Sequence, residues 1–484
     1  MLYCEPFFLF FFLPLTLGVY FVSPQSWRNF VLVAASLLFY AVGEDHFFFW
    51  LVGSVLLNYW LAIMIAKNAG RPAARTYLII GLVSDLALLF VFKYTTFAVE
   101  NLNGLLAWAQ APTLRVPHIP LALGISFFTF HKISYKVDVY RGTAPARRNL
   151  VELALYILLF PQLIAGPIVR YQEIATELHT RFTTRNDLAA GICRFICGLG
   201  KKMILANAMG HCTDSILALP SEQVGTGLAW LAVVCYTGQI YFDFSGYSDM
   251  AIGLARLFGF HFPENFNYPY VARSITDFWH RWHMSLSRWF RDYLYIPLGG
   301  NRVAPWRVYF NLFLVFFLCG LWHGANWHFA VWGMFHGLLL VAEKRGLGKA
   351  LLRMPVAVQH GYTMFLVMIG WVLFRADTLE QATDLLLKMA GLKVASAATV
   401  GLREFLNGEL AVILMVGAVA ATPIIHWVRA GLEQLTDRLS SVETRRALDF
   451  SRGSLATASL LVILVYSSML IASGTYNPFI YYRF

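Results

Sequence analysis

Long apolar stretches dominate this sequence and leave it few ways to fold. A helix needs about 20 mainly apolar residues to cross the hydrocarbon core of a bilayer, and roughly ten to twelve stretches approach that requirement. They lie near residues 5–22, 28–43, 47–66, 77–92, 119–135, 151–169, 188–210, 226–260, 308–341, 359–374, 409–428 and 455–473. Only 13% of the residues are charged, against about 25% in soluble domains. We therefore expect an all-α integral membrane protein that crosses the bilayer many times.

The N-terminus and the basic loops predict how the chain is inserted. Glu5 stands where a cleavable signal peptide has basic residues, and no small-x-small cleavage site follows, so residues 5–22 are expected to stay as the first span. The positive-inside rule places basic loops in the cytoplasm, here Lys67, Arg71 and Arg75, then Lys132, Lys136, Arg141, Arg147 and Arg148. The N-terminus is then outside. The same rule accounts for most of the net charge of +11, so that charge does not indicate nucleic-acid binding.

Two of the apolar stretches contain helix breakers. Residues 119–135 include Pro120 and Gly124, and residues 151–169 include F-P-Q-L-I-A-G-P. Broken helices persist at membrane depth only where protein or a water-filled cavity satisfies the freed backbone groups, so these spans are expected to surround something other than lipid. No repeat or long soluble linker appears, and we expect residues 1–484 to form one membrane domain. The six cysteines include no C-x-x-C pair, which argues against a metal or redox site.

The segment 271–307 differs from the other loops because arginines alternate with aromatic residues, a composition typical of a membrane interface. Ser274 and Asp277 have the spacing of a helix cap, and Asp277–Arg281 and Arg288–Asp292 have the spacing of helical ion pairs. An interfacial helix accounts for these features, but it does not account for the histidines at 280 and 283. An H-x-x-H pair without a third ligand is a poor zinc signal, so no metal is predicted.

Two carboxylates interrupt the apolar residues 236–260. Asp243 and Asp249 would each cost at least about 2.5 kcal/mol at the bilayer centre, so they must face protein or water. The neighbouring residues Gly238, Gly246 and Gly253 would allow close helix packing, and Ser245, Tyr247 and Ser248 offer hydrogen bonds. Residues 246–250 begin like a G-x-S-x-G nucleophile elbow, but Met250 replaces the last glycine and no strand precedes it. A serine hydrolase is therefore a poor interpretation, and a polar bundle interior is the better one.

Three histidines occur in the apolar residues 318–337, LCGLWHGANWHFAVWGMFHG, which are read as part of one span. His328 and His336 share one helix stripe with Trp332, which helix packing would explain. His323 lies between Trp322 and Gly324, with Asn326 one turn further on, and the nearby glycines leave room for a ligand. Ionisable groups within a membrane indicate function by default, and a neutral imidazole can accept a proton near neutral pH. His323 is therefore the candidate general base.

Five motifs together resemble the membrane-bound O-acyltransferase superfamily, and within it the bacterial alginate O-acetyltransferases and related exopolysaccharide enzymes. They are D-F-W-x-R-W-H-x-S-L-S-x-W-x-R-D (277–292), L-W-H-G-A-N (321–326), F-D-F-S-G-Y-S-D-M-A-I-G (242–253), F-P-Q-L-I-A-G-P (160–167) and N-P-F-I-Y-Y-R-F (477–484). The resemblance implies a ring of about eleven transmembrane helices around a central tunnel, with re-entrant and interfacial helices. Residues 271–300 would form part of a cytoplasmic funnel. His280 and His131 depart from the alginate pattern, which leaves the acceptor open.

The resemblance also implies roles for individual residues. His323 would be the catalytic histidine of the W-H-G motif, and His283 the second functional histidine. The expected supporting residues are Asn326, Trp322, Asp243, Asp249 and Ser287, and the expected donor-binding residues are Arg281, Arg288 and Arg291. Arginine suits these positions because its fork of donors matches phosphate oxygens.

The resulting functional hypothesis is an enzyme of the bacterial inner membrane, multi-pass, with no bound cofactor and no metal. It would use acetyl-CoA as acyl donor and O-acetylate an extracytoplasmic polysaccharide such as alginate, directly or through a periplasmic partner protein. Three alternatives remain: a D-alanyl or other acyltransferase with a carrier-protein donor, a secondary transporter, and a non-enzymatic scaffold of an export complex. Broken helices also occur in transporters, but no internal repeat supports that reading. The sequence leaves the acceptor hydroxyl, the oligomeric state and the helix count open.

Overall fold

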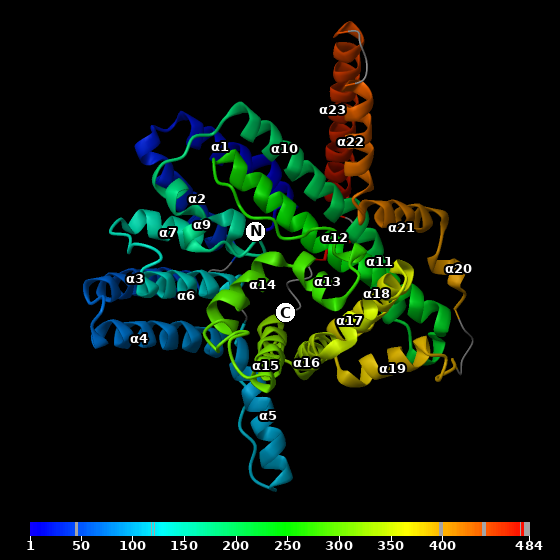
Figure 1. Cartoon of the computed structure of the whole chain (residues 1–484), viewed down its shortest axis with the longest axis horizontal. Coiled ribbons are helices and arrows are strands. Elements are labelled where there is room, and N and C mark those ends of the chain that lie inside the picture. The colour runs from blue at the N-terminus through cyan, green and yellow to red at the C-terminus, as the bar shows by residue number, and fades with distance from the viewer. Residues whose placement is uncertain are drawn as a thin grey trace.

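The computed structural model describes residues 1–43, 47–117, 119–120, 122–395, 400–437, 442–474 and 476–478. Every regular element in these ranges is helical, which confirms the predicted all-α class (Figure 1). The α-helices are α1 (Leu13–Val22), α2 (Arg28–Ala41), α3 (Phe48–Lys67), α4 (Pro72–Leu89), α5 (Thr95–Trp108), α6 (Ile125–Arg141), α7 (Leu150–Leu158), α8 (Phe160–Leu163), α9 (Tyr171–His179), α10 (Arg185–Gly200), α11 (Asn207–Leu217), α12 (Thr226–Leu257), α13 (Ile275–Arg281), α14 (Met284–Phe290), α15 (Pro305–His323), α16 (Trp327–Ala342), α17 (Gly348–Leu351), α18 (Val356–Arg375), α19 (Leu379–Met389), α20 (Leu402–Phe405), α21 (Gly408–Ala420), α22 (Ile424–Asp437) and α23 (Val442–Ala472).

The helices confirm a membrane protein. Within the described residues, five are long and apolar enough to cross a bilayer, namely Phe48–Lys67, Pro72–Trp108, Pro305–His323, Val356–Arg375 and Glu443–Ala472. The ring of about eleven helices and its tunnel stay predictions. Of the C-terminal motif 477–484, residues 479–484 lie outside the described part of the chain.

Helix α12 is the central element of the fold and packs along α10 (Figure 1). Glycines make this contact close: a methyl group at Gly246 would lie 2.7 Å from the carbonyl oxygen of Gly198, and one at Gly253 equally close to that of Gly191. Such separations are shorter than any van der Waals contact of carbon with oxygen, so only glycine fits. The predicted role of Gly246 and Gly253 in helix packing is confirmed.

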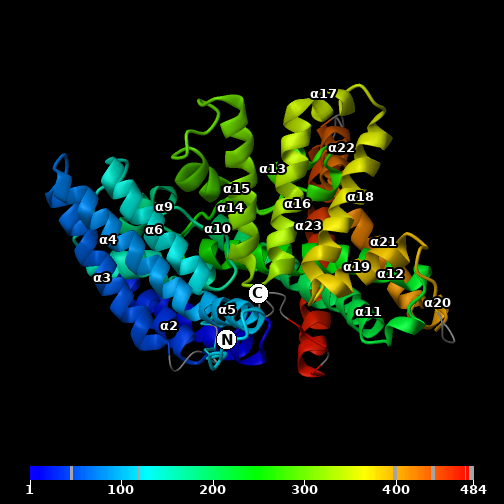
Figure 2. The same ribbon diagram turned by 90° about the horizontal axis from the view of Figure 1, so that it is seen from below.

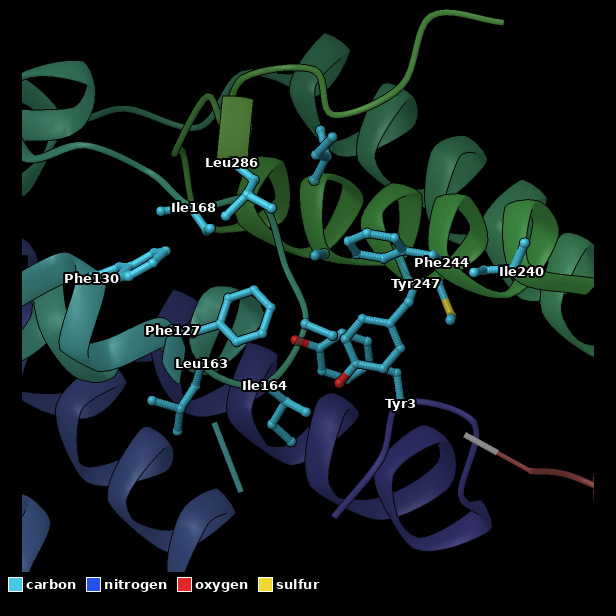
Figure 3. Packing of buried hydrophobic residues seen from close by; sticks show 14 of the residues in the cluster. Tyr3, Phe127, Phe130, Leu163, Ile164, Ile168, Ile240, Phe244, Tyr247 and Leu286 are labelled. Atoms are coloured by element: carbon cyan, nitrogen blue, oxygen red, sulfur yellow. The ribbon is translucent and has the colours of Figure 1, made fainter. Parts of the chain in front are cut away.

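The broken stretches 119–135 and 151–169 pack against each other, as expected for interrupted helices that face protein. Gly124 has a φ of 76° and precedes α6, and a Cβ there would lie 2.4 Å from the carbonyl oxygen of Leu163. Phe127 and Leu163 lie side by side in the buried cluster that joins α6, α8 and α14 (Figure 3). This cluster positions the start of α6 next to the site described below.

Two lysines assigned to a basic loop are instead buried within α6. Lys132 and Lys136 are fully buried, and both pair with Asp85 of α4. Lys136 also donates a hydrogen bond to the carbonyl oxygen of Gly81, at 2.8 Å. The prediction that these lysines lie in a cytoplasmic loop is wrong, because a carboxylate one helix away compensates their charge. The positive-inside argument for this loop then depends on the three arginines at 141, 147 and 148.

The predicted span 308–341 is also wrong as a single helix, because it is a hairpin of α15 and α16 (Figure 2). The two helices pack closely through Gly320 and Gly333: a methyl group at either would lie 2.2 Å from a backbone carbonyl oxygen of the other helix. The break falls at residues 324–326, so His323 ends α15, while His328 and His336 belong to α16.

Candidate active site

Helices α13 and α14 carry the R-W-H motif into the centre of the molecule (Figure 1). The predicted cap is confirmed, since the Ser274 hydroxyl accepts a hydrogen bond from the Asp277 amide at 2.9 Å, and so is the Asp277–Arg281 ion pair, at 2.8 Å. The predicted Arg288–Asp292 pair is wrong: Asp292 pairs with Arg170 and Arg291. The apolar face of both helices is buried, so this segment packs within the protein more deeply than a surface interfacial helix would.

His283 occupies the break between α13 and α14 in a strained conformation. Its φ of 43° is rare for a residue with a side chain, and such strain occurs preferentially at functional sites. It therefore does not share a helical turn with His280, although the two are only three residues apart. The side chain is 1% exposed, and its Nε2 has no hydrogen-bond partner among the described residues.

Asn265, which the sequence reading missed, fixes the orientation of the His283 ring. The Asn265 amide nitrogen donates to Ser248 Oγ at 2.8 Å, while its Oδ1 accepts from the backbone amide of Ser285 at 3.3 Å. These contacts orient the amide so that Oδ1 lies 3.0 Å from His283 Nδ1. Nδ1 must then carry the proton, which leaves Nε2 of a neutral ring as an acceptor. Only the fold brings Asn265 to this position.

His323 lies at the last turn of α15 within an aromatic enclosure. Its ring centroid is 4.9 Å from that of Trp322, 5.2 Å from that of Trp332 and 5.2 Å from that of Phe374. Trp322 also lies 6.3 Å from the ring of His283, so one indole separates the two histidines. The indole N–H groups of Trp322 and Trp332 are buried and have no hydrogen-bond partner among the described residues. Unpaired buried donors are uncommon and require an explanation.

Two cavities lie on either side of His323 along the chain. The first, which we call the arginine cavity, has a volume of 410 Å³ and includes Arg288, Arg291 and Cys319 in its lining. The second, the asparagine cavity, has a volume of 250 Å³ and includes Gly324 and Asn326. Cys319 precedes His323 by one helical turn and Gly324 follows it directly. His323 itself is in the lining of neither cavity, but it lies on the chain between Cys319, which lines the first, and Gly324, which lines the second.

The expected donor-binding arginines do not all share one place. Arg288 and Arg291 line the arginine cavity, as does the predicted supporting residue Ser287, whereas Arg281 is not in its lining and binds Asp277. Burial lowers the pKa of the Arg288 guanidinium, and its Nε has no hydrogen-bond partner among the described residues. Arg288 donates one hydrogen bond, from Nη2 to the Glu264 carbonyl oxygen at 3.4 Å, and so keeps donor capacity for a ligand.

The remaining histidines of the hairpin have structural partners. His336 Nδ1 accepts a hydrogen bond from the Trp279 indole at 3.3 Å, and His328 Nδ1 lies 3.2 Å from the Leu373 carbonyl oxygen. Asn326 caps α16 by accepting from the His328 amide, and it also lines the asparagine cavity. These contacts support packing as the role of His336, whereas His328 also lines the asparagine cavity.

The two expected supporting carboxylates lie in α12 and are neutralised by basic residues of α10 and of the π-helical turn Lys201–Ala206 that follows it. Asp243 pairs with Lys202 at 2.8 Å, while Asp249 pairs with Arg194 at 2.8 Å and with Lys201 at 2.6 Å. The expectation that both carboxylates face protein is therefore confirmed. None of these pairs could be assigned from sequence spacing alone, because 41 to 55 residues separate the partners.

Comparisons with known proteins show which family this chain is similar to. Residues 127–403 match the sequence model of the family described as MBOAT, membrane-bound O-acyltransferase. A probable alginate O-acetylase of Pseudomonas putida is 39% identical, with 100% of both chains covered, and the corresponding protein of Azotobacter vinelandii is 38% identical over the same share. A peptidoglycan O-acetyltransferase of Helicobacter pylori is 37% identical over 84% of this chain and 83% of its own.

The matched range includes both histidine motifs, the arginine cavity and the break between α15 and α16. Within the described residues, no group of three His, Cys, Asp or Glu side chains is arranged to hold a metal ion. The chain is a membrane protein and belongs to the membrane-bound O-acyltransferase family, as an O-acyltransferase related to alginate and peptidoglycan O-acetyltransferases.

Proposed function

We propose that this enzyme transfers acetyl groups from cytoplasmic acetyl-CoA, across the bacterial inner membrane, for O-acetylation of an extracytoplasmic polysaccharide. The observation that carries the proposal is that His323 ends α15 between Cys319, which lines the arginine cavity, and Gly324, which lines the asparagine cavity. If the acyl donor reaches the base from the cytoplasmic side and the acceptor hydroxyl from the other side, the acyl group can be transferred between molecules in different compartments. The tunnel of the sequence prediction would connect these cavities.

The arginine cavity suits a coenzyme A thioester. Arg288 and Arg291 offer charge and donors for phosphates, and the apolar residues Leu312, Val315 and Phe316 line the part nearer α15, where an acyl-pantetheine arm would extend. Cys319 ends this lining one helical turn before His323. The acetyl carbonyl would then lie next to the base, and no bound cofactor or metal is required.

The reaction is an acyl transfer. The acceptor hydroxyl attacks the thioester carbonyl while His323 takes its proton, a C–O bond forms, the C–S bond breaks, and the proton passes to the departing thiolate. The buried indole N–H groups of Trp322 and Trp332, together with the amide of Asn326, are donors for the developing oxyanion. His283, held by Asn265, would accept a hydrogen bond at Nε2 from an N–H group of the acyl donor or from the acceptor hydroxyl.

The class of acceptor is proposed from the names of the relatives. Those described above are named for alginate and peptidoglycan O-acetylation, which supports a polysaccharide as final acceptor, reached directly or through a hydroxyl of a periplasmic partner protein. A carrier-protein thioester is the second candidate donor. Teichoic acid D-alanyltransferase of Bacillus subtilis is 33% identical over 45% of this chain, and residues 271–307 would provide the docking surface.

The test is acetate transfer from radiolabelled acetyl-CoA to the polymer or partner fraction in membrane vesicles. His323→Ala is expected to abolish transfer while the protein still inserts, and His360→Gln, at an exposed histidine of α18, is the matched control. Arg288→Ala is expected to raise the KM for acetyl-CoA more than Arg281→Ala, because only Arg288 lines the cavity. Normal acetylation by His323→Ala would overturn the enzyme mechanism and favour a transporter or scaffold.

A further inference from the structure

The end of helix α15 is held by a buried lysine that the sequence reading did not select. Lys93 lies in the π-helical turn Phe90–Tyr94 between α4 and α5. Its ammonium donates hydrogen bonds to the carbonyl oxygens of Trp322 and His323, the latter at 3.0 Å, and to Ser126 Oγ at 3.4 Å. An ammonium has three donors, and all three are directed at the two segments that form the site.

The carbonyls that Lys93 binds would otherwise lack partners. The last four carbonyls of an α-helix have no intrahelical donor, and after His323 the chain becomes extended, with Gly324 at φ −159°. Tyr94 supplies a further donor, since its hydroxyl lies 2.9 Å from the Leu321 carbonyl oxygen. Two consecutive residues of one turn therefore bind three consecutive carbonyls, which end at that of His323.

The charge of Lys93 has no carboxylate partner within 4.0 Å among the described residues. By contrast Lys132, Lys136 and Lys202, also buried, all pair with aspartates. The compensating charge at Lys93 is the negative end of the α15 dipole, equivalent to roughly half an elementary charge. Lys93 thus binds the backbone at the end of the helix that carries His323, while Trp322, Trp332 and Phe374 enclose the imidazole ring of His323.

We infer that Lys93 is a positioning residue for the acyl-transfer reaction: its ammonium fixes the backbone of Trp322 and His323, and so the imidazole of His323, relative to Ser126 on α6. This inference rests on the proposed role of His323 as the base. Lys93 acts through His323 and not on the acyl group. Its loss should therefore change turnover more than donor binding, because a shift of about 1 Å in a reacting group can cost about 100-fold in rate.

The experiment compares Lys93→Met and Lys93→Arg with Lys132→Met, a matched control that removes a buried lysine whose ammonium binds Asp85 and Ser54. In vesicles supplied with radiolabelled acetyl-CoA, Lys93→Met is expected to lower kcat about 10- to 100-fold with little change in the KM for acetyl-CoA. Lys93→Arg should recover part of kcat, since a guanidinium can still donate to two carbonyls. Unchanged kcat in Lys93→Met, or an equal loss in Lys132→Met, would overturn the inference.

A second readout does not depend on acetyl transfer. Carbethoxylation of His323 by diethyl pyrocarbonate, followed by mass spectrometry, reports the accessibility and nucleophilicity of the imidazole directly. Lys93→Met should alter this rate and Lys132→Met should not, even if His323→Ala proves active and the proposed function fails. Should Lys93→Met not fold, Lys93→Gln, which keeps a polar side chain but loses the charge and one donor, takes its place. Equal kcat and equal His323 modification in Lys93→Gln would then overturn the inference.

Discussion

The buried cluster of Asp85, Lys132 and Lys136 makes a sharp prediction about stability. Lys132 Nζ lies 3.1 Å from one carboxylate oxygen of Asp85, Lys136 binds the other, and the Asn58 amide donates to Asp85 at 3.0 Å. None of the three charged side chains is more than 2% exposed. Asp85→Asn keeps the size of the side chain but leaves two buried cations without a counter-ion. Lys132→Met leaves the Asp85–Lys136 pair intact.

The magnitudes follow from the charges. At 3.1 Å and an effective dielectric constant of about 20, one lysine–aspartate contact is worth about 5 kcal/mol before desolvation is counted. A buried charge left without its partner costs about 3–5 kcal/mol, whereas apolar replacement of buried charges that leaves none uncompensated is often nearly neutral. The cluster carries a net charge of +1, which becomes +2 in Asp85→Asn and 0 in Lys132→Met. We expect a loss of about 3–5 kcal/mol for the first and under about 1 kcal/mol for the second.

Thermal unfolding in detergent, followed by fluorescence-detected size exclusion, measures the difference. On a scale of about 2 °C per kcal/mol for long chains, Asp85→Asn should lower the Tm by roughly 6 °C or more and Lys132→Met by about 2 °C or less. The double variant Asp85→Asn/Lys132→Met should regain part of the loss, because one uncompensated cation is removed. Equal Tm values for the two single variants, or a double variant less stable than Asp85→Asn, would refute the electrostatic reasoning.

Two further predictions concern packing and the site. Gly333→Ala should prevent accumulation of folded protein in the membrane, because its methyl group would lie 2.2 Å from the Phe316 carbonyl oxygen. The control Gly361→Ala should accumulate normally, because the space around Gly361 is open. Equal yields of the two variants would contradict this account. Asn265→Leu should lower the rate of acetyl transfer at least about tenfold, equivalent to about 1.4 kcal/mol, because His283 Nδ1 loses its hydrogen-bond acceptor. Transfer at the normal rate would show that His283 needs no such support.

The sequence predicted best where local chemistry decides the structure. The Ser274 cap, the Asp277–Arg281 pair and the glycine contacts of α12 depend on short spacings or on residue size, and all are confirmed. Lys132 and Lys136 were misplaced because the positive-inside rule reads lysines without their partners. Asp85, which compensates them, stands about 50 residues earlier on another helix. A charge count cannot distinguish a loop cation from a buried pair.

The hairpin of α15 and α16 shows why the site itself was only half predictable. A hydropathy profile treats residues 308–341 as one continuous stretch, because the three residues Gly324, Ala325 and Asn326 are too few to interrupt an apolar window. The break at these residues nevertheless leaves backbone carbonyls within an apolar stretch without intrahelical donors. Those carbonyls need donors that lipid cannot supply, and Lys93 and Tyr94 provide them from a segment about 230 residues earlier. The polar groups that end the helix therefore gather where His323 sits. A helix end within an apolar stretch requires such groups, and the distant residues that supply them cannot be identified from hydropathy or from local spacing.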